Sequence, residues 1–131
     1  MPHYSKSSKN KLLTAHSVLQ EIFNEVIEEY DNTILCGHRN KEDQNAAVAE
    51  GKSKVNWPDG NHNKNPSWAV DAAPYPIDWD DLPRFYYFAG IVKGVALAKG
   101  YKIRWGGDWD GDLNLSEERF RDLVHFEIIF S

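Results

Sequence analysis

The amino-acid sequence predicts an α+β domain in which a small, mostly antiparallel sheet is flanked by two substantial helices. Apolar residues recur at helical spacing over residues 10–30, and a second helical segment covers 81–100. Short apolar runs bounded by turn-forming residues predict the strands. A chain of 131 residues is long enough for one hydrophobic core, so we expect a single domain over residues 1–131.

The first part of the chain is predicted to form a helix, a strand and a second helix. The helix over 10–30 has Ser8 or Asn10 as its cap, and residues 1–9 before it are expected to form a frayed terminus. The apolar run TILCG ends at a glycine and predicts a short buried strand. The run KEDQNAAVAE predicts a short helix that Gly51 ends.

The rest of the chain begins with a loop at 51–66 that is rich in glycine, asparagine, lysine and proline. WAVDAAPY predicts a buried strand, YKIRWGG and VHFEIIF predict two more, and the helix at 81–100 ends at Gly100. The loop DWDGDLN and a short polar segment at 116–122 separate the last two strands. Close packing of the long helix against the sheet is predicted from its small residues, Gly90, Gly94, Ala96 and Ala98.

Composition argues against several classes of protein. The net charge is −5 and no sustained basic patch occurs, which argues against a nucleic-acid partner. No apolar run approaches membrane-spanning length and the N-terminal residues lack the apolar core of a signal peptide, so we expect no stable membrane insertion. The single cysteine, Cys36, provides no internal disulfide and suits a reducing cytoplasm.

Asp71 lies inside the apolar run WAVDAA, where an unpaired charge would cost several kcal/mol. A metal ion is one possible compensation. His62, Asp71 and His125 would provide two nitrogens and one oxygen with a fourth position open, which is the ligand set typical of catalytic zinc. The alternatives are that each histidine is structural and that the aspartate anchors a turn.

The segment DLVHFEII places two carboxylates near His125. Asp122 lies three residues before it, where it would act as the base beside the metal. Alternate residues of a strand share a face, so Glu127 and His125 point the same way. Glu127 either orients the His125 imidazole or is a solvated strand residue.

These motifs resemble those of a known family. SWAVDAAPYPIDW, the upstream His62 and DLVHFEI are similar to the zinc peptidases of the VanY-type D-alanyl-D-alanine carboxypeptidase family, and most closely to the short L-alanyl-D-glutamate endopeptidases that bacteriophages use as endolysins. The resemblance implies a Hedgehog/DD-peptidase-like zinc peptidase fold. It also implies that His62, Asp71 and His125 bind Zn²⁺ and that Asp122 is the catalytic acid/base.

The upstream run GHRNKEDQ also matches the family pattern. The resemblance implies that Arg39 contacts the substrate carboxylate or the oxyanion and that Gln44 is its structural or binding neighbour. The spacing between histidine and aspartate departs from the pattern: His62 and Asp71 are nine residues apart instead of seven. A loop absorbs two residues at small entropic cost, and His38 is the alternative histidine.

The resemblance implies a zinc-dependent peptidoglycan peptidase whose partner is the stem peptide of the bacterial wall. Cleavage between L-alanine and D-glutamate is the favoured reaction, and D-alanyl-D-alanine carboxypeptidase activity is the alternative. We expect a monomer that accumulates in the cytoplasm of the host bacterium and reaches the wall and periplasm after membrane permeabilisation. Two rivals remain: a non-catalytic zinc-binding wall-recognition module, and an unrelated aromatic-rich hydrolase or carbohydrate-binding domain.

Five tryptophans in so short a chain favour a groove or a dense core. Trp68, Trp105 and Trp109 are candidates for lining the groove and Trp57 for its edge, although core packing is the commoner use of each. The acidic run DWDGDLN suggests a calcium loop, but its glycine stands fourth instead of sixth and Arg119 stands at position twelve. A turn-rich loop is therefore the better interpretation.

Overall fold

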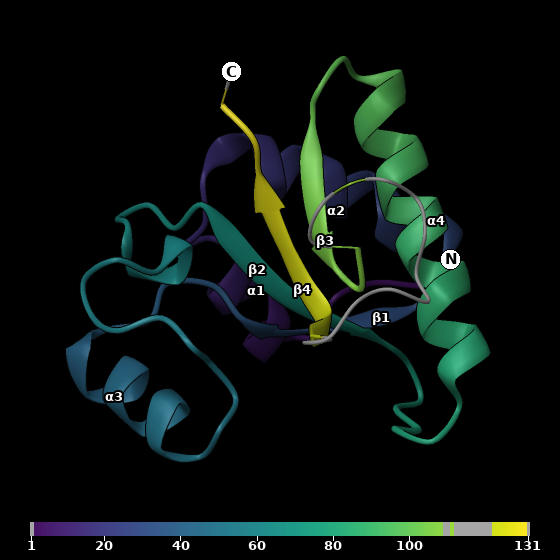
Figure 1. Ribbon diagram of the computed structural model, residues 1–131. Coiled ribbons are helices and arrows are strands. Elements are labelled where there is room, and N and C mark those ends of the chain that lie inside the picture. Colours follow the sequence, from purple (N-terminus) through teal and green to yellow (C-terminus); the bar gives the residue numbers. More distant parts are fainter. Residues whose placement is uncertain (1, 109–110, 112–121, 131) are drawn as a thin grey trace.

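The structure is a computed structural model that describes residues 2–108, 111 and 122–130, and the fold is α+β as predicted (Figure 1). Among these residues four strands form one antiparallel sheet in the order β1-β2-β4-β3. The strands are β1 (Asn32–Cys36), β2 (Ala69–Pro74), β3 (Ile103–Gly106) and β4 (Asp122–Ile128). The helices are α1 (Lys6–Leu12), α2 (Ser17–Glu29), α3 (Lys41–Ala49), the short 3-10 helix η1 (Asn61–Asn63) and α4 (Leu82–Ala98).

Helices α2 and α4 pack on each other and on one face of the sheet, while α1 packs against β1. Figure 1 shows α3 set apart from these layers, beyond the connection that leads into β2. Alternate residues of a strand face opposite sides of the sheet. Val70, Ala72 and Phe126 consequently belong to the hydrophobic core, and the residues between them point to the other face.

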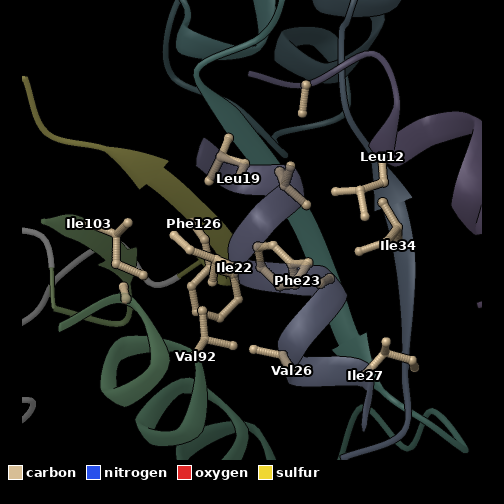
Figure 2. Close-up of a cluster of buried hydrophobic side chains, with 14 of the residues drawn as sticks. Leu12, Leu19, Ile22, Phe23, Val26, Ile27, Ile34, Val92, Ile103 and Phe126 are labelled. Atoms are coloured by element: carbon tan, nitrogen blue, oxygen red, sulfur yellow. The ribbon is translucent and has the colours of Figure 1, made fainter. Parts of the chain in front are cut away.

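The core is centred on α2, which inserts a stripe of apolar side chains between the sheet and α4 (Figure 2). Phe126 of β4 meets Phe23 and Phe88 in edge-on contacts with ring centroids 5.7 and 5.9 Å apart. All three rings are fully buried. Burying a side chain of this size contributes about 1.5–3 kcal/mol, so the three rings hold β4 against α2 and α4.

The single helix predicted over 10–30 is wrong, because the structure has two helices with a break between them. Ser67 accepts a hydrogen bond from the His16 N–H (2.8 Å) and donates its own N–H to Thr14 (3.0 Å). These backbone groups are therefore unavailable for helical bonds. The His16 imidazole Nδ1 then caps α2 by accepting from the Val18 N–H at 3.1 Å.

The prediction of a frayed terminus over residues 1–9 is also wrong for residues 4–9. Helix α1 begins at Lys6 and its cap is Ser5, whose side chain accepts from the Ser8 N–H. Tyr4 is buried, and its hydroxyl donates to Asn32 Oδ1 at 2.7 Å. A buried, hydrogen-bonded aromatic side chain anchors the segment to the first residue of β1.

Helix α4 has the predicted position, but its glycines do not face the sheet. Gly90 and Gly94 are exposed, and a Cβ built on either one would meet nothing within 4 Å. Of the predicted small residues Ala96 does pack in the core, together with Ala89, whereas Ala98 is exposed. No helix of the described residues is long and apolar enough to cross a membrane. The loop predicted at 108–114 and the polar segment at 116–122 lie largely outside the described residues.

Candidate metal centre

The face of the sheet opposite the core carries a buried polar cluster. Asp71 of β2 and His125 of β4 are directly paired across the two strands. Their neighbours Val70 and Phe126 point into the core, so strand alternation directs Asp71 and His125 to the other face. The helix η1 places His62 against the same two residues, since the loop between His62 and β2 absorbs the long spacing.

His62, Asp71 and His125 form a group in which one ligand atom from each residue lies within 4.8 Å of the others. Asp71 Oδ1 is 3.0 Å from His62 Nε2 and 3.4 Å from His125 Nδ1. All three residues are buried. Two imidazole nitrogens and one carboxylate oxygen therefore converge on one small volume, as a metal site requires.

Each of these side chains is held from behind by a second hydrogen bond. His62 Nδ1 lies 2.7 Å from the Gly37 carbonyl oxygen, and His125 Nε2 lies 2.7 Å from Glu127 Oε1. An acceptor at each of these nitrogens holds one ring proton there, so the other nitrogen directs its lone pair at the centre once it has lost its own proton. The second oxygen of Asp71 accepts from the Arg39 guanidinium at 3.3 Å.

Burial opposes a charge on each of the three residues, but their mutual attraction is stronger. Burial disfavours the imidazolium of His62, yet the Asp71 carboxylate raises the pKa of His62 to about 10. Burial disfavours the Asp71 carboxylate, yet His62 and His125 hold the pKa of Asp71 well below its ordinary value. Against the same burial effect, hydrogen bonds to Asp71 and Glu127 raise the pKa of His125. A metal cation would therefore displace protons when it binds.

Asp122 begins β4 beside this group and lines the cavities on both sides of it. Burial, together with the charge of Asp71, raises the pKa of Asp122 to about 6, although the nearby cationic groups oppose the shift. Strand β3 approaches the Asp122 backbone so closely that a Cβ on Gly106 would collide with the Asp122 carbonyl. Asp122 thus has a carboxyl that gains or loses a proton close to neutral pH.

Arg39 is held by Gln44 as well as by Asp71. Gln44 is buried, and its Oε1 accepts from Arg39 and from Asn63 Nδ2, each at 3.1 Å. Its Nε2 donates to Ser53 Oγ at 3.0 Å and to the Val55 carbonyl at 2.6 Å. These four bonds use the full capacity of an amide side chain. The geometry therefore favours the structural role of Gln44 over direct substrate binding.

Two cavities flank the cluster, and Arg39, Lys52 and Asp122 line both of them. The first has a volume of about 460 Å³ and adds Lys54 and Arg104 to its wall. The second has a volume of about 530 Å³, and its wall includes Leu35, Cys36, Trp79 and Val124. A ligand that extends across the centre would thus meet Lys54 and Arg104 on one side and Leu35, Trp79 and Val124 on the other.

Several sequence predictions can be compared with this geometry. Glu127 is buried and bonded to His125, which agrees with the orienting role. His38 lies outside the group, with its N–H bonded to Thr14 Oγ1 at 2.8 Å. Trp105 packs in the core, and Trp68 packs on Phe130 with ring centroids 4.8 Å apart. Trp57 lines neither cavity, and Trp109 and Arg119 lie outside the described residues.

Sequence reasoning missed residues that support or line the site. Gly37 lies in the run GHRNKEDQ but acts through its backbone carbonyl, and Asn63 acts through amide hydrogen bonds, roles that residue type alone does not reveal. Asn61 donates to Glu127 Oε2 at 2.8 Å from the start of η1. Strand alternation with the apolar residues on either side could have placed Arg104 on the polar face. Its position opposite Glu127 depends on the β3–β4 register.

This chain is similar to known proteins both in sequence and in fold. A family model described as phage L-alanyl-D-glutamate peptidase matches residues 2–129. The chain is 29% identical over 134 residues to the L-alanyl-D-glutamate peptidase of Escherichia phage T5, a match that covers 96% of this chain and 97% of that relative. The fold of this chain is similar to that in the crystal structure of the Serratia marcescens L-Ala D-Glu endopeptidase ChiX, with a TM-score of 0.76 and 21% sequence identity. The match covers 98% of this chain and 91% of that chain. The resemblance inferred from the motifs is thereby confirmed, and the chain belongs to the phage L-alanyl-D-glutamate peptidase family.

Proposed function

We propose that this peptidase is a zinc-dependent peptidoglycan hydrolase that cuts the wall stem peptide between L-alanine and D-glutamate. One observation carries the proposal. His62, Asp71 and His125 direct three ligand atoms at one volume, with Asp122 beside them in the wall of two cavities. A closed structural metal site has no use for an adjacent acid/base, so the arrangement favours catalysis over a recognition module.

The donor set fits zinc. Two imidazole nitrogens and one carboxylate oxygen are typical ligands of catalytic zinc sites, and the outer partners Gly37, Glu127 and Arg39 already orient them. When bound, the ion supplies Lewis-acid activation of water and of the scissile carbonyl. His62, Asp71 and His125 would hold it.

The protein's own groups account for the proton transfers. The Asp122 carboxylate takes a proton from the attacking water as the new carbon–oxygen bond forms, and returns it to the leaving amine as the carbon–nitrogen bond breaks. A pKa of about 6 suits both steps, because the group is ionised before the reaction and is still a usable acid afterwards. Arg39 lines both cavities, where its positive charge stabilises the developing oxyanion.

The specificity for the alanyl–glutamyl bond rests on the family to which the chain belongs and on the activity named for the phage T5 relative. The same kinship supports a phage endolysin that is made in the host cytoplasm and reaches the wall once the membrane is permeabilised. We propose that residues 1–131 act as one catalytic domain and as a monomer. D-alanyl-D-alanine carboxypeptidase activity is a separate outcome of the test below.

Mass analysis of purified peptidoglycan after digestion tests the proposal. New N-terminal D-glutamate with matching L-alanine carboxyl ends is the expected result, and a chelator abolishes it until zinc is restored. Asp122→Asn is expected to keep its zinc and lose cleavage, whereas Asp43→Asn, an exposed aspartate on α3, retains both. Released D-alanine would instead indicate a carboxypeptidase. Zinc binding without any peptide cleavage would indicate a recognition module.

A further inference from the structure

The cavity that contains His62 and His125 has a basic wall, although the chain as a whole is acidic. Arg39, Lys52, Lys54 and Arg104 face this cavity, together with the carboxylates Asp59, Asp122 and Glu127. The net charge of the chain is −5, so an excess of cations here is a local feature. A cavity of this kind attracts an anionic group.

Arg104 is the cation best placed to bind a ligand. It lies on β3 opposite Glu127 and on the polar face of the sheet, because its neighbours Ile103 and Trp105 enter the core. Its side chain is 42% exposed. Lys52 is a weaker candidate, since it pairs with Glu50 at 3.2 Å and is largely solvated.

Glu127 does not occupy the Arg104 guanidinium. The two carboxylate oxygens of Glu127 are bonded to His125 at 2.7 Å and to Asn61 at 2.8 Å. Arg104 Nη1 stands 3.9 Å from Glu127 Oε2, which is too far for a hydrogen bond. Among the described residues the Arg104 side chain donates no hydrogen bond, so its fork of N–H groups is available to a ligand in the cavity.

The proposed reaction places a carboxylate close to the scissile bond. The leaving amine belongs to a glutamyl residue, which has two carboxyl groups. One of them forms the amide bond to the next residue of the peptide, so the other stays free and charged. A guanidinium binds such a carboxylate through two parallel hydrogen bonds. The alanyl residue on the other side of the bond carries only a methyl group.

We propose that Arg104 binds the free carboxylate of the glutamyl residue, and that the second cavity, beside Leu35, Val124 and Trp79, receives the alanyl side. This inference rests on the proposed function and assigns a direction to the substrate. Asp122 and Arg39 line both cavities. With the substrate in this direction, they lie at the scissile bond. Arg104 becomes a residue that determines specificity for the amine side.

Two synthetic peptides test the assignment, identical except that the free glutamyl carboxylate of one is a carboxamide in the other. The wild-type protein is expected to prefer the carboxylate peptide by about tenfold or more in kcat/KM, as one charged hydrogen-bonded contact gives. Arg104→Met is expected to lose this preference by slowing cleavage of the carboxylate peptide alone. Lys102→Met is the matched control: Lys102 is exposed just before β3 and lines neither cavity.

The outcomes separate this inference from the proposed function. If the wild-type protein cleaves the carboxylate peptide and Arg104→Met keeps the preference, the assignment of Arg104 is wrong and the proposed function stands. If Arg104→Met slows both peptides equally, Arg104 acts only as structural support for Glu127, and the assignment is again wrong. If the wild-type protein cleaves neither peptide, the proposed function itself fails. Zinc content and melting temperature of each variant exclude misfolding.

Discussion

The two faces of the sheet are made by the same strands but are held together by different forces. On one face Val70 and Phe126 pack against the helices, and their contribution comes from area removed from water, without directional requirements. On the other face Asp71 and His125 are also buried, yet their geometry depends on hydrogen bonds and ion-pair contacts of 2.7–3.4 Å to defined partners. Packing on the apolar face therefore holds the strands in place, and the hydrogen bonds on the polar face depend on that fixed backbone.

The comparison teaches that a defect on each face should have a different cost. A cavity on the apolar face lowers the free energy of unfolding and should leave the chemistry of the surviving folded molecules intact. A lost partner on the polar face should change metal affinity or rate while the fold persists. The following predictions test this separation, from the largest expected effect to the smallest.

Phe126→Ala should lower the free energy of unfolding by about 3–5 kcal/mol, because the ring is fully buried and its removal leaves a cavity. Urea denaturation in the presence of a chelator measures this. The milder Phe126→Leu should cost less and still bind one zinc ion per molecule. A loss smaller than about 1 kcal/mol for the alanine variant would mean that this face is not tightly packed.

Asp122→Asn should reduce kcat/KM on an alanyl–glutamyl peptide by roughly 10²–10⁴-fold, as loss of a general acid/base does. The raised pKa of Asp122 means that its charge is unfavourable in the folded protein. Unfolding in the presence of a chelator should therefore show no loss of stability. A variant that is both inactive and much less stable would instead indicate a structural role.

Zinc affinity should fall as pH falls, by about tenfold per pH unit for each proton released on binding. The pKa of His62 is about 10, so its imidazole carries a proton near neutral pH that zinc must displace, and the raised pKa of His125 acts in the same direction. Titration calorimetry near pH 8 in two buffers with different ionisation enthalpies counts these protons. Uptake without proton release would contradict the prediction.

The same His62–Asp71 pair should affect stability when zinc is removed by a chelator. A raised histidine pKa contributes stability that is fully present below the unfolded pKa and is lost as pH rises through about 10. The lowered pKa of Asp71 acts in the opposite range, since its contribution is present above the pKa of an unfolded aspartate and is lost progressively as pH falls below it. Melting temperatures across the pH range, compared with those of His62→Gln, isolate the contribution of the pair.

Glu127→Gln should weaken zinc binding or activity by about 10–100-fold, which is the usual cost of losing the partner of a metal-binding histidine. The carboxylate accepts from His125 at 2.7 Å, so removing its charge weakens the orientation of the imidazole. Glu28→Gln on the exposed side of α2 is the control with the same chemical change. Equal effects of the two substitutions would argue against an orienting role.

Gly90→Ala should have the smallest effect. It should raise the free energy of unfolding by about 0.5–1 kcal/mol, whereas Phe126→Ala lowers it. Gly90 lies inside α4, and a Cβ there would meet nothing within 4 Å. Thermal unfolding of this variant and of Ala89→Gly on the buried side provides the contrast, since the second should destabilise. A destabilising Gly90→Ala would mean that this glycine face makes a close contact.

The local sequence pattern is enough to predict an element when the residues of that element determine its structure. The apolar runs predict β1 and β2, the composition of the run before Gly51 predicts α3, and strand alternation places Glu127 beside His125. The motif containing Asp71 and the motif containing His125 indicate the chemistry of the site before any distance is known. Their cross-strand pairing requires the sheet.

Hydrophobic periodicity predicted the wrong structure where a residue far away in the sequence provided the hydrogen-bond partner. Residues 10–30 have helical spacing throughout, yet Ser67 interrupts the helix because its backbone bonds to Thr14 and His16. Tyr4 is ordered by Asn32, and no property of the first nine residues reveals that contact. The small residues of α4 predict close packing, but only Ala89 and Ala96 turn towards the core.

By itself the sequence determined the fold class, most of the elements and the residue types of the proposed zinc site, since these follow from local spacing and short motifs. The tertiary structure alone decided the convergence of His62 with Asp71 and His125, the hydrogen-bonded support from Gln44, and the position of Arg104 at the basic cavity. The physical reason is that register and cavity walls arise from contacts between segments far apart in the chain. Such contacts leave no periodic trace in either segment.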